Sequence, residues 1–194
     1  QEKTIHLFNR QVATVKSLAA EFKEQEFLTS LTTFNDFTNH IVQESNVSEL
    51  KELTADMYRP DGLTALYDAI GESVDRIREQ YKNLLANNEM SVVMIILTDG
   101  HENASRKYGV GDIGRMIKTL EETGKWTFTI LGADFDITAV SSHMNFRSSA
   151  SLNYDKAYFC EMTEDIEESI RYYAKEKSKG HISKDFFQKK ERNH

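Results

Sequence analysis

The stretch that decides the fold is Val92–Gly100, VVMIILTDG, in which six apolar residues are followed by Thr98, Asp99 and Gly100. Uninterrupted apolar runs of this length are typical of strands buried on both faces, as in parallel sheets. Asp99 and Gly100 follow at the carboxyl end of this strand, which is the edge where open α/β sheets bind ligands. The sequence therefore predicts a buried strand with a binding site at Asp99.

A second loop, Arg59–Leu66 (RPDGLTAL), precedes a long amphipathic helix and carries a hydroxyl group at Thr64. Pro60 and Gly62 mark this segment as a turn. The oxygen atoms of Thr64 and Asp99, on two separate loops, are of the kind that hard divalent cations prefer as ligands. Thr64 and Asp99 are therefore the candidate metal ligands of this chain.

Apolar residues along the rest of the chain recur at spacings that alternate between helix and strand. The pattern predicts one compact α/β domain over residues 1–180 and a tail over residues 181–194, with a mostly parallel sheet covered by helices on both faces. The expected elements are a helix at 2–23, two strands near 27–42 with Asn35 and Asp36 at their turn, a helix at 63–84, a strand at 91–97, a helix at 110–120 closed by Gly124, a strand at 126–131, a helical piece at 137–144 and a helix around 166–173 ended by Gly180.

The amino-acid composition argues against several classes of binding partner. The chain has 31 acidic and 24 basic residues, and its net charge of -7 argues against nucleic acid as the main partner. The basic residues Lys184, Lys189, Lys190 and Arg192 are interpreted as a solvated tail. The single Cys160 excludes an internal disulfide and is expected to be a packed thiol. No apolar run is long enough to span a bilayer, so we expect no membrane partner and favour a cytoplasmic location.

Three segments occur in a characteristic order, each at the end of a helix or strand: 62–70 (GLTALYDAI), 98–105 (TDGHENAS) and 128–134 (FTILGAD). Together they resemble the von Willebrand factor type A domain, and more closely its small bacterial and phage members. The resemblance covers roughly residues 1–180 and implies a doubly wound, Rossmann-like α/β fold. It also implies a metal-ion-dependent adhesion site, in which oxygens from three loops hold a divalent cation, usually Mg²⁺. Thr64 would supply the hydroxyl of the second loop and Asp99 the carboxylate of the third.

The first metal-binding loop of that family, D-x-S-x-S at the end of the first strand, is absent from this chain. Residues 4–9 resemble the part that follows it, so we expect the missing strand and motif upstream of Gln1. The family's strand order, 3-2-1-4-5-6, then leaves a gap between the strands near Phe27 and Ser91. Unpaired buried backbone groups cost about 1–3 kcal/mol each. We therefore expect upstream residues, the tail near 182–187 or a strand of another copy to fill the gap.

The polar neighbours of the two candidate ligands are assigned mainly to loop structure. Thr64 is expected to cap the following helix in addition to binding metal. Glu102 and Asn103 are expected to order their loop and not to touch the metal. Asp61 and Asp68 are interpreted as solvated or capping acids.

The preferred function is a non-enzymatic protein-binding module, whose partner supplies an Asp or Glu to complete the coordination of Mg²⁺ at Thr64 and Asp99. One alternative is a metal-free scaffold that binds partners by its surface or forms a homo-oligomer through its incomplete sheet, because two ligands are few for Mg²⁺. A further alternative is a metal-dependent hydrolase that uses Asp99 with Asp134 and Asp136. We expect the chain not to be an enzyme.

Overall fold

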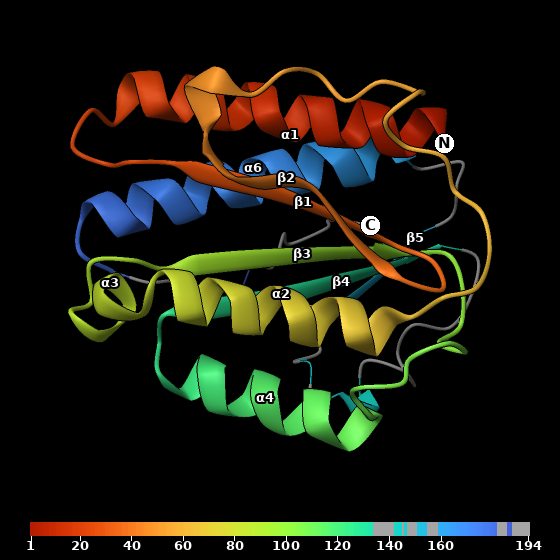
Figure 1. The fold of residues 1–194 in the computed structure, drawn as a ribbon. Helices are drawn as coiled ribbons and strands as arrows, with labels where there is room; N and C mark the ends of the chain where they lie inside the picture. Colours follow the sequence, from red (N-terminus) through yellow and green to blue (C-terminus); the bar gives the residue numbers. More distant parts are fainter. Residues whose placement is uncertain (134–141, 145, 147–150, 155–158, 182–185, 188–194) are drawn as a thin grey trace, which may run out of the picture.

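The structure is a computed structural model that describes residues 1–133, 142–144, 146, 151–154, 159–181 and 186–187 of the 194-residue chain. These residues form a mixed α/β fold (Figure 1). In chain order the elements are α1 (Glu2–Glu21), β1 (Leu28–Phe34), β2 (Thr38–Asn46), the 3-10 helix η1 (Val47–Glu49), α2 (Leu66–Gln80), α3 (Lys82–Ala86), β3 (Val92–Thr98), α4 (Val110–Glu122), β4 (Trp126–Ala133), β5 (Ser151–Tyr154) and α6 (Phe159–Ser178).

The described strands form two separate sheets, whereas the sequence predicts a single sheet with a gap. β1 and β2 pair as an antiparallel hairpin, with Asn35 and Asp36 at the predicted turn. β3, β4 and β5 form a parallel sheet in that order, with Val92 opposite Trp126 at the start of the β3–β4 pairing. The α/β class is confirmed, but the parallel arrangement is confirmed only for these three strands. The division lies between β1 and β3, where the gap was expected.

The side chains of β3 point alternately to its two faces, and each face packs against a different pair of helices. Val92 and Ile96 pack in a core that α2 and α4 complete, where Val74 and Ile117 are fully buried. The alternate side chains face a second core, which α1 and α6 complete together with part of β4. Those side chains are Val93, Ile95 and Leu97. In Figure 1, accordingly, α2 and α4 lie on one side of β3 and α1 and α6 on the other.

The predicted helix at 63–84 is divided in two. α2 ends at Gln80, and Tyr81 has φ -111° and ψ 25° before α3 begins at Lys82. The ends of two other helices agree with the sequence, because Gly124 and Gly180 follow α4 and α6 with φ of +70° and +81°. Glycine adopts this left-handed conformation without the steric cost that other residues meet.

Other expectations have mixed outcomes. Cys160 is exposed, so its prediction as a packed thiol is wrong: it lies at the start of α6, beside the buried Phe159, and faces outward.

β5, the strand 151–154, was not predicted, because four residues are too few to show a pattern. The expected helical piece at 137–144 falls mostly outside the described residues, and so do the basic residues at 184–192.

The end of the chain contributes to the core at one described position. Phe186 is 1% exposed and belongs to the core formed by α1, α6 and β4. Its ring meets that of Phe187 edge-on, with the centroids 5.0 Å apart. Part of the segment expected as a tail is thus packed against the helices that cover β3.

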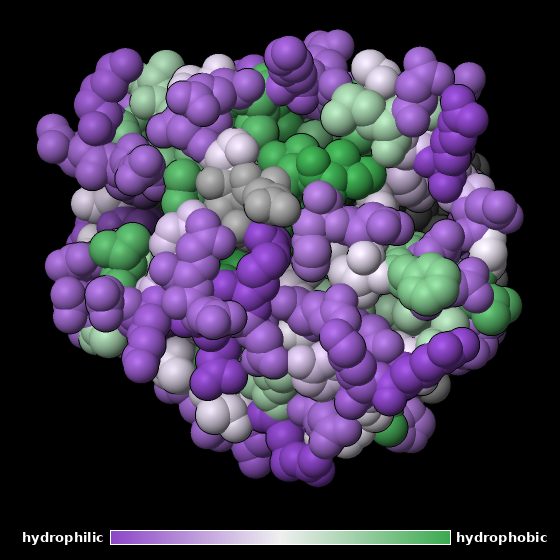
Figure 2. All heavy atoms as spheres, viewed as in Figure 1, coloured by the Kyte–Doolittle hydropathy of each residue, from purple (hydrophilic) through white to green (hydrophobic). Residues whose placement is uncertain are grey.

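The outer surface is mainly hydrophilic in the view of Figure 2, with apolar residues in small groups. This agrees with the burial of the apolar helix faces against the sheets. None of the helices in the described ranges is long and apolar enough to cross a membrane.

One polar side chain on the buried face of α1 lacks a partner. Gln11 follows Leu7 by one helical turn, and Thr14 and Leu18 continue the same buried stripe. Neither the amide oxygen nor the amide nitrogen of Gln11 has a hydrogen-bond partner among the described residues, although both atoms are buried. A buried polar group without a partner costs about 1–3 kcal/mol.

We expect Gln11→Met to raise the free energy of unfolding by about 1–2 kcal/mol, because it removes this unpaired amide and keeps a long flexible side chain. The matched control is Gln25→Met, since the Gln25 amide donates to the carbonyl oxygen of Ala174 at 3.1 Å. Urea unfolding of both variants measures the difference, and the control should unfold earlier than wild type. A lower midpoint for Gln11→Met would contradict the assignment.

Candidate functional site

The structure brings the two candidate metal ligands to one edge of the parallel sheet. A Cβ atom added at Gly100 would lie 2.8 Å from the Thr64 hydroxyl oxygen, so this hydroxyl lies directly against the turn that carries Asp99. The Thr64 N–H donates to the Asn103 side-chain oxygen at 2.8 Å, and the Asn103 N–H donates to the Thr64 carbonyl at 3.1 Å. The predicted meeting of the two loops is confirmed, and metal binding by Thr64 and Asp99 stays a prediction.

The turn at the end of β3 is closed by a hydroxyl group. The side chain of Thr98, which is buried, donates to the Gly100 carbonyl at 3.1 Å and accepts from the Gly100 N–H at 3.4 Å. Such local bonds by Thr stabilise tight turns. Asp99 therefore lies in a fixed turn and is exposed to solvent.

The first turn of α2 receives its hydrogen-bond acceptors from the loop that follows β3. One Glu102 carboxylate oxygen accepts from the Tyr67 N–H at 3.0 Å, and the Ser105 hydroxyl oxygen accepts from the Asp68 N–H at 3.1 Å. The helix begins at Leu66 with no side-chain cap of its own. The prediction that Thr64 caps this helix is therefore wrong, because the neighbouring loop supplies the acceptors that a capping residue normally provides.

Glu102 also holds its own loop together. Its carboxylate accepts from the N–H groups of Ala104 and Ser105 at 2.9 and 2.8 Å and from the Ser105 hydroxyl at 2.7 Å. Burial alone would raise the pKa of Glu102, but these donors and the Tyr67 N–H stabilise the charged form and lower the pKa below its usual value. The predicted role of Glu102 and Asn103 in ordering the loop is confirmed.

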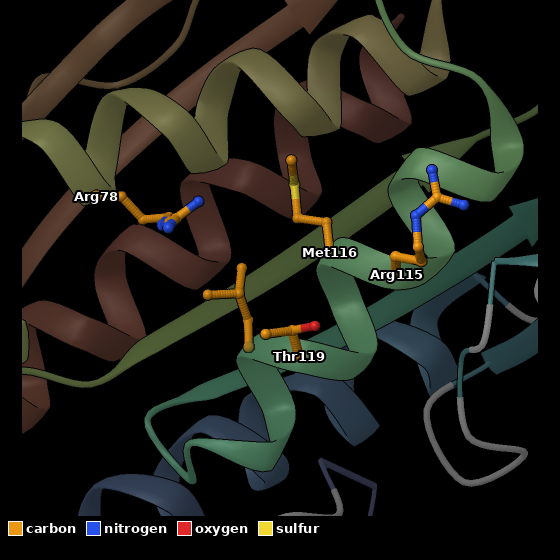
Figure 3. A pocket seen from close by; sticks show the side chains of 5 residues that line it. Arg78, Arg115, Met116 and Thr119 are labelled. Carbon is orange, nitrogen blue, oxygen red and sulfur yellow. The ribbon is translucent and has the colours of Figure 1, made fainter.

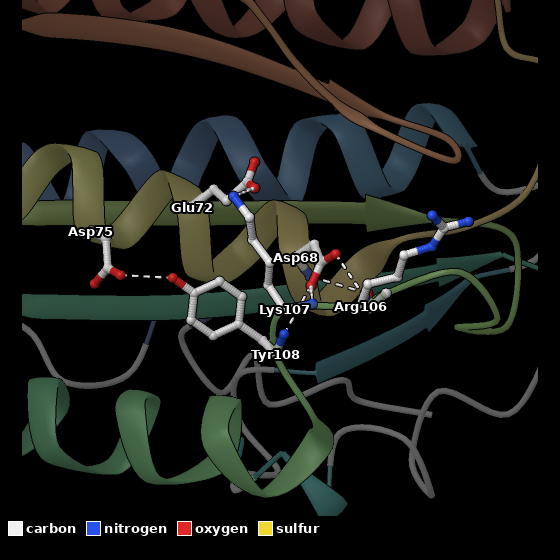
Figure 4. A network of polar contacts seen from close by, with 7 residues as sticks. Asp68, Glu72, Asp75, Arg106, Lys107 and Tyr108 are labelled. Atoms are coloured by element: carbon white, nitrogen blue, oxygen red, sulfur yellow. Dashed lines mark hydrogen bonds and ion pairs between the residues drawn. The ribbon is translucent and has the colours of Figure 1, made fainter.

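Asp68, on the first turn of α2, holds the next part of this loop (Figure 4). Its carboxylate accepts backbone N–H bonds from Arg106, Lys107 and Tyr108 at 2.8, 2.9 and 2.9 Å. Burial opposes the charge, but these three donors, together with the Lys107 ammonium, lower the pKa of Asp68. Asp68 thus anchors the loop after β3, and is not the solvated or helix-capping acid that the sequence predicts.

Two side chains extend this anchor along α2. The Lys107 ammonium donates to Glu72 at 2.6 Å, and the Tyr108 hydroxyl donates to Asp75 at 2.7 Å (Figure 4). The bond to the Asp75 carboxylate, helped by burial, raises the pKa of Tyr108 to about 12. The Tyr108 ring lies so close to α2 that a Cβ atom at Gly71 would be 2.5 Å from it.

The β1–β2 turn supports the Thr64 loop from the other side. The Asp36 carboxylate accepts from the Leu63 N–H at 3.2 Å, and the Ala65 N–H donates to the Asn35 carbonyl at 2.7 Å. Asp61 accepts from the N–H of the next residue at 2.8 Å, which agrees with its predicted structural role. The Thr64 loop is therefore held between the hairpin and the loop after β3.

The amino end of α1 reaches the same edge. The Gln1 amide donates to the carbonyls of Ala55 and Tyr58 at 3.1 and 2.6 Å. Burial raises the pKa of the Tyr58 hydroxyl, which also bonds Thr4 and lies near enough to Asp99 for the carboxylate charge to raise that pKa further. An open hollow beside these residues is lined by Gln1, Ala55, Asp56, Arg59 and Pro60.

A second hollow, of about 230 Å³, lies between α2 and α4 (Figure 3). Its two guanidinium groups already face carboxylates on their own helices: Arg78 lies 3.7 Å from Asp75, and Arg115 lies 2.6 Å from Asp112. Met116, Thr119 and Leu120 complete the lining. Since Arg78 is in the last turn of α2 and Thr64 precedes the first, this hollow is separate from the candidate site.

Comparison of the sequence with protein-family models and with curated proteins finds no match. In the part of the chain that the structure describes, no group of three or more His, Cys, Asp or Glu side chains could hold a metal. The hydrolase candidates Asp134 and Asp136 lie outside the described residues.

Sequence reasoning missed the packing of Tyr108 on Gly71. The available signal was a glycine inside an otherwise regular amphipathic helix, which is destabilising by about 1 kcal/mol relative to Ala unless a close contact requires it. The partner of this glycine lies on the loop that follows β3 and could not be located from spacing alone.

We expect Gly71→Ala to lower the free energy of unfolding by about 1–3 kcal/mol, because the added methyl group displaces the Tyr108 ring. Gly111→Ala, in the first turn of α4, is the matched control, since the nearest atom to its Cβ is 3.4 Å away on a flexible Arg115 side chain. Helix propensity predicts that the control is neutral or more stable than wild type. Equal unfolding midpoints for the two variants in urea would contradict the role given to Tyr108.

The low pKa of Glu102 predicts how stability depends on pH. A carboxylate whose pKa is lower in the folded protein stabilises it above the ordinary value of 4.5, and this contribution is lost as pH falls through the folded value. We expect Glu102→Gln to lower the free energy of unfolding by about 2 kcal/mol at neutral pH. The difference from wild type should shrink as the pH falls below 4.5 and through the lowered pKa of Glu102, because Glu102 itself then becomes protonated. Urea titrations at neutral and at acidic pH, with the exposed Glu89→Gln as control, test this; a pH-independent difference would contradict it.

Proposed function

We propose that this chain is a non-enzymatic protein-binding module of the von Willebrand factor type A kind. A divalent cation, expected to be Mg²⁺, binds at Thr64 and Asp99, and an Asp or Glu of a partner protein completes its coordination. The observation that carries the proposal is the contact between the Thr64 hydroxyl and the Asp99–Gly100 turn, on two loops already fixed by Asn103 and Glu102.

The donor set suits such a cation. Mg²⁺ prefers oxygen ligands, usually keeps several waters, and is bound through one or two protein carboxylates together with oxygen atoms of its ligand, here the partner's Asp or Glu. Thr64 and Asp99 offer a hydroxyl and a carboxylate, and the exposure of Asp99 leaves room for a partner. When bound, the cation supplies positive charge between the Asp99 carboxylate and the carboxylate of the partner. Without it these two groups would repel each other, and the net charge of -7 on the chain would add to the repulsion.

The finer fold assignment belongs to the same proposal. We interpret the β1–β2 hairpin and the β3–β4–β5 sheet as two parts of one doubly wound sheet, whose first strand is not among the described elements. The support for this interpretation is that helices cover both faces of β3 and that α1 also packs on the hairpin side through Val12. Thr64 and Asp99 then lie on loops at the carboxyl edge of the combined sheet, where α/β sheets bind ligands.

A metal-free scaffold is the second candidate. It is favoured by the sequence, in which the D-x-S-x-S loop does not occur and Thr64 and Asp99 are the two candidate ligands. Such a scaffold would bind its partner equally well with and without divalent cations. The two candidates therefore differ in one measurable property, which is the dependence on metal.

Calorimetric titration of Mg²⁺ and Mn²⁺ into the chain distinguishes them. We expect binding that Asp99→Asn weakens by at least about tenfold, a loss of roughly 1.4 kcal/mol, because the charged ligand is removed. Asp56→Asn, which makes the same charge change at an exposed position, should leave the affinity unchanged. Gly100→Ala should also weaken binding, because its methyl group would displace the Thr64 hydroxyl.

Each result has a definite meaning. Equal affinity in wild type and Asp99→Asn would place the metal elsewhere, and no heat in wild type would favour the scaffold. Circular dichroism of each variant confirms that it is folded. Where metal binds, capture of a protein partner that is lost in EDTA would extend the result from metal binding to the adhesion function.

A further inference from the structure

The two most exposed large apolar side chains of the described residues lie beside the candidate site. Phe37 is 70% exposed and Leu63 is 51% exposed. The other exposed large apolar side chains in the described ranges lie between 37% and 46%; they are Met57, Leu84, Val110 and Tyr172. Phe37 belongs to the turn of the β1–β2 hairpin, and Leu63 directly precedes Thr64. Figure 1 shows this turn, the loop before α2 and the end of β3 on the same side of the molecule.

The two segments that carry Phe37 and Leu63 are in direct contact. The Leu63 N–H donates to the Asp36 carboxylate at 3.2 Å, and Asp36 is the residue before Phe37. A Cβ atom added at Gly62 would lie 3.5 Å from the Cβ atom of Asn35 in the same turn. Phe37 and Leu63 therefore start from neighbouring backbone positions beside Thr64. We call these two residues the apolar pair.

The fold does not need the apolar pair. None of the three cores formed by the described residues includes Phe37 or Leu63. Tight turns favour Gly, Asn and Asp over Phe, and here Asn35 makes the hydrogen bonds of the turn. Its side-chain oxygen accepts from the Phe37 N–H at 3.0 Å, and its N–H donates to the Phe37 carbonyl at 3.1 Å. Neighbouring apolar side chains that are exposed on an ordered backbone are typical of binding surfaces.

We propose that the apolar pair, Phe37 and Leu63, binds a large apolar side chain of the partner protein, one or two residues from the Asp or Glu that completes the metal site. The inference rests on the proposed function, because the cation at Thr64 and Asp99 sets the position of the partner's acid. The short spacing follows from the chain, since Leu63 and Thr64 are consecutive and an extended segment spans only about 3.3–3.6 Å per residue.

The charge around the apolar pair determines the class of occupant. Asp36, Asp61 and Asp99 lie on the same loops, and Asp61 and Asp99 are exposed. Basic residues on either side of the partner's acid and apolar side chain would therefore be attracted to this edge. A second copy would bring the same acids and a net charge of -7 against them, and an anionic membrane surface would repel them. The occupant is thus a basic segment of another protein with one acid and an adjacent large apolar residue.

The test is a set of peptide titrations into the ¹⁵N-labelled chain in excess Mg²⁺, followed by NMR. The probe is a peptide blocked at both ends, Lys-Ser-Phe-Asp-Phe-Ser-Lys, which presents a phenylalanine on each side of the acid. One control peptide has serine in place of both phenylalanines, and the other has asparagine in place of the aspartate. The first control removes the apolar contact, and the second removes the metal ligand.

We expect the probe to shift the backbone amide signals of Phe37, Leu63 and Gly100. The serine peptide should bind at least about fivefold more weakly, because it buries no large apolar side chain. The asparagine peptide should also bind more weakly, because a neutral amide replaces the carboxylate that reaches the cation.

Variants of the chain locate the contact. Phe37→Ser and Leu63→Ser should each weaken binding of the probe at least about threefold and leave binding of the serine peptide unchanged, since coupling is expected only where both contacting groups are present. The matched control is Leu84→Ser, because Leu84 is also exposed but belongs to α3. It should bind both peptides as wild type does. Equal urea midpoints of wild type, Phe37→Ser and Leu63→Ser show that the effect is on binding and not on stability.

The outcomes separate this inference from the proposed function. Equal affinity for the probe and the serine peptide would overturn the role of the apolar pair, while weaker binding of the asparagine peptide would still support the metal site. Equal affinity for the probe and the asparagine peptide would contradict the proposed function and, with it, the placement of the apolar side chain.

Two further results would assign the apolar pair to another occupant and overturn the inference. Changes of the Phe37 and Leu63 signals on dilution of the free chain would indicate a second copy. Co-sedimentation of wild type, but not of Phe37→Ser, with vesicles of phosphatidylglycerol and phosphatidylcholine would indicate a membrane surface.

Discussion

The Glu102 carboxylate is the group on which the arrangement of the candidate site most depends. It accepts hydrogen bonds from its own loop and from the first turn of α2, and so joins the end of β3 to the start of the helix that follows Thr64. The first N–H groups of a helix have no partner within the helix, and here the acceptors come from another loop. α2 and the loop after β3 therefore stabilise each other, and their contact holds Thr64 beside the Asp99 turn.

This arrangement has a consequence for binding. The Thr64 loop has supports on two sides: Asn103 on the loop after β3 and Asp36 on the hairpin turn. Asp68 anchors the rest of the loop to α2 through backbone N–H groups. A ligand of the proposed site would meet loops that are already ordered, so less of its binding free energy would be lost to conformational entropy. The acids that sequence reasoning assigned to structure thus prepare the position of the exposed Asp99.

The features that the sequence predicts correctly are those whose signal lies within one short segment of the chain. The apolar run of β3, the periodic stripes of the helices and the glycines after α4 and α6 all locate elements. The meeting of the Thr64 loop with the Asp99–Gly100 turn was expected from the family resemblance, which implies that both residues belong to one metal site. The helix cap at Thr64 was wrong because the true acceptors, Glu102 and Ser105, lie more than thirty residues away. The break at Tyr81 escaped prediction because it leaves no periodic signal, whereas the division between β1 and β3 lies where the family's strand order leaves a gap.

The division of the sheet and the candidate site are physically connected. Asn35 and Asp36, at the end of β1, hold the loop of Thr64, whereas Asp99 directly follows β3. The spacing between β1 and β3 therefore helps to set the position of the Thr64 hydroxyl relative to the Asp99 carboxylate. A cation held by both side chains, as proposed, would favour one spacing of the hairpin relative to the parallel sheet. It would therefore shift the protein toward that arrangement, because a ligand stabilises the conformation that it binds best.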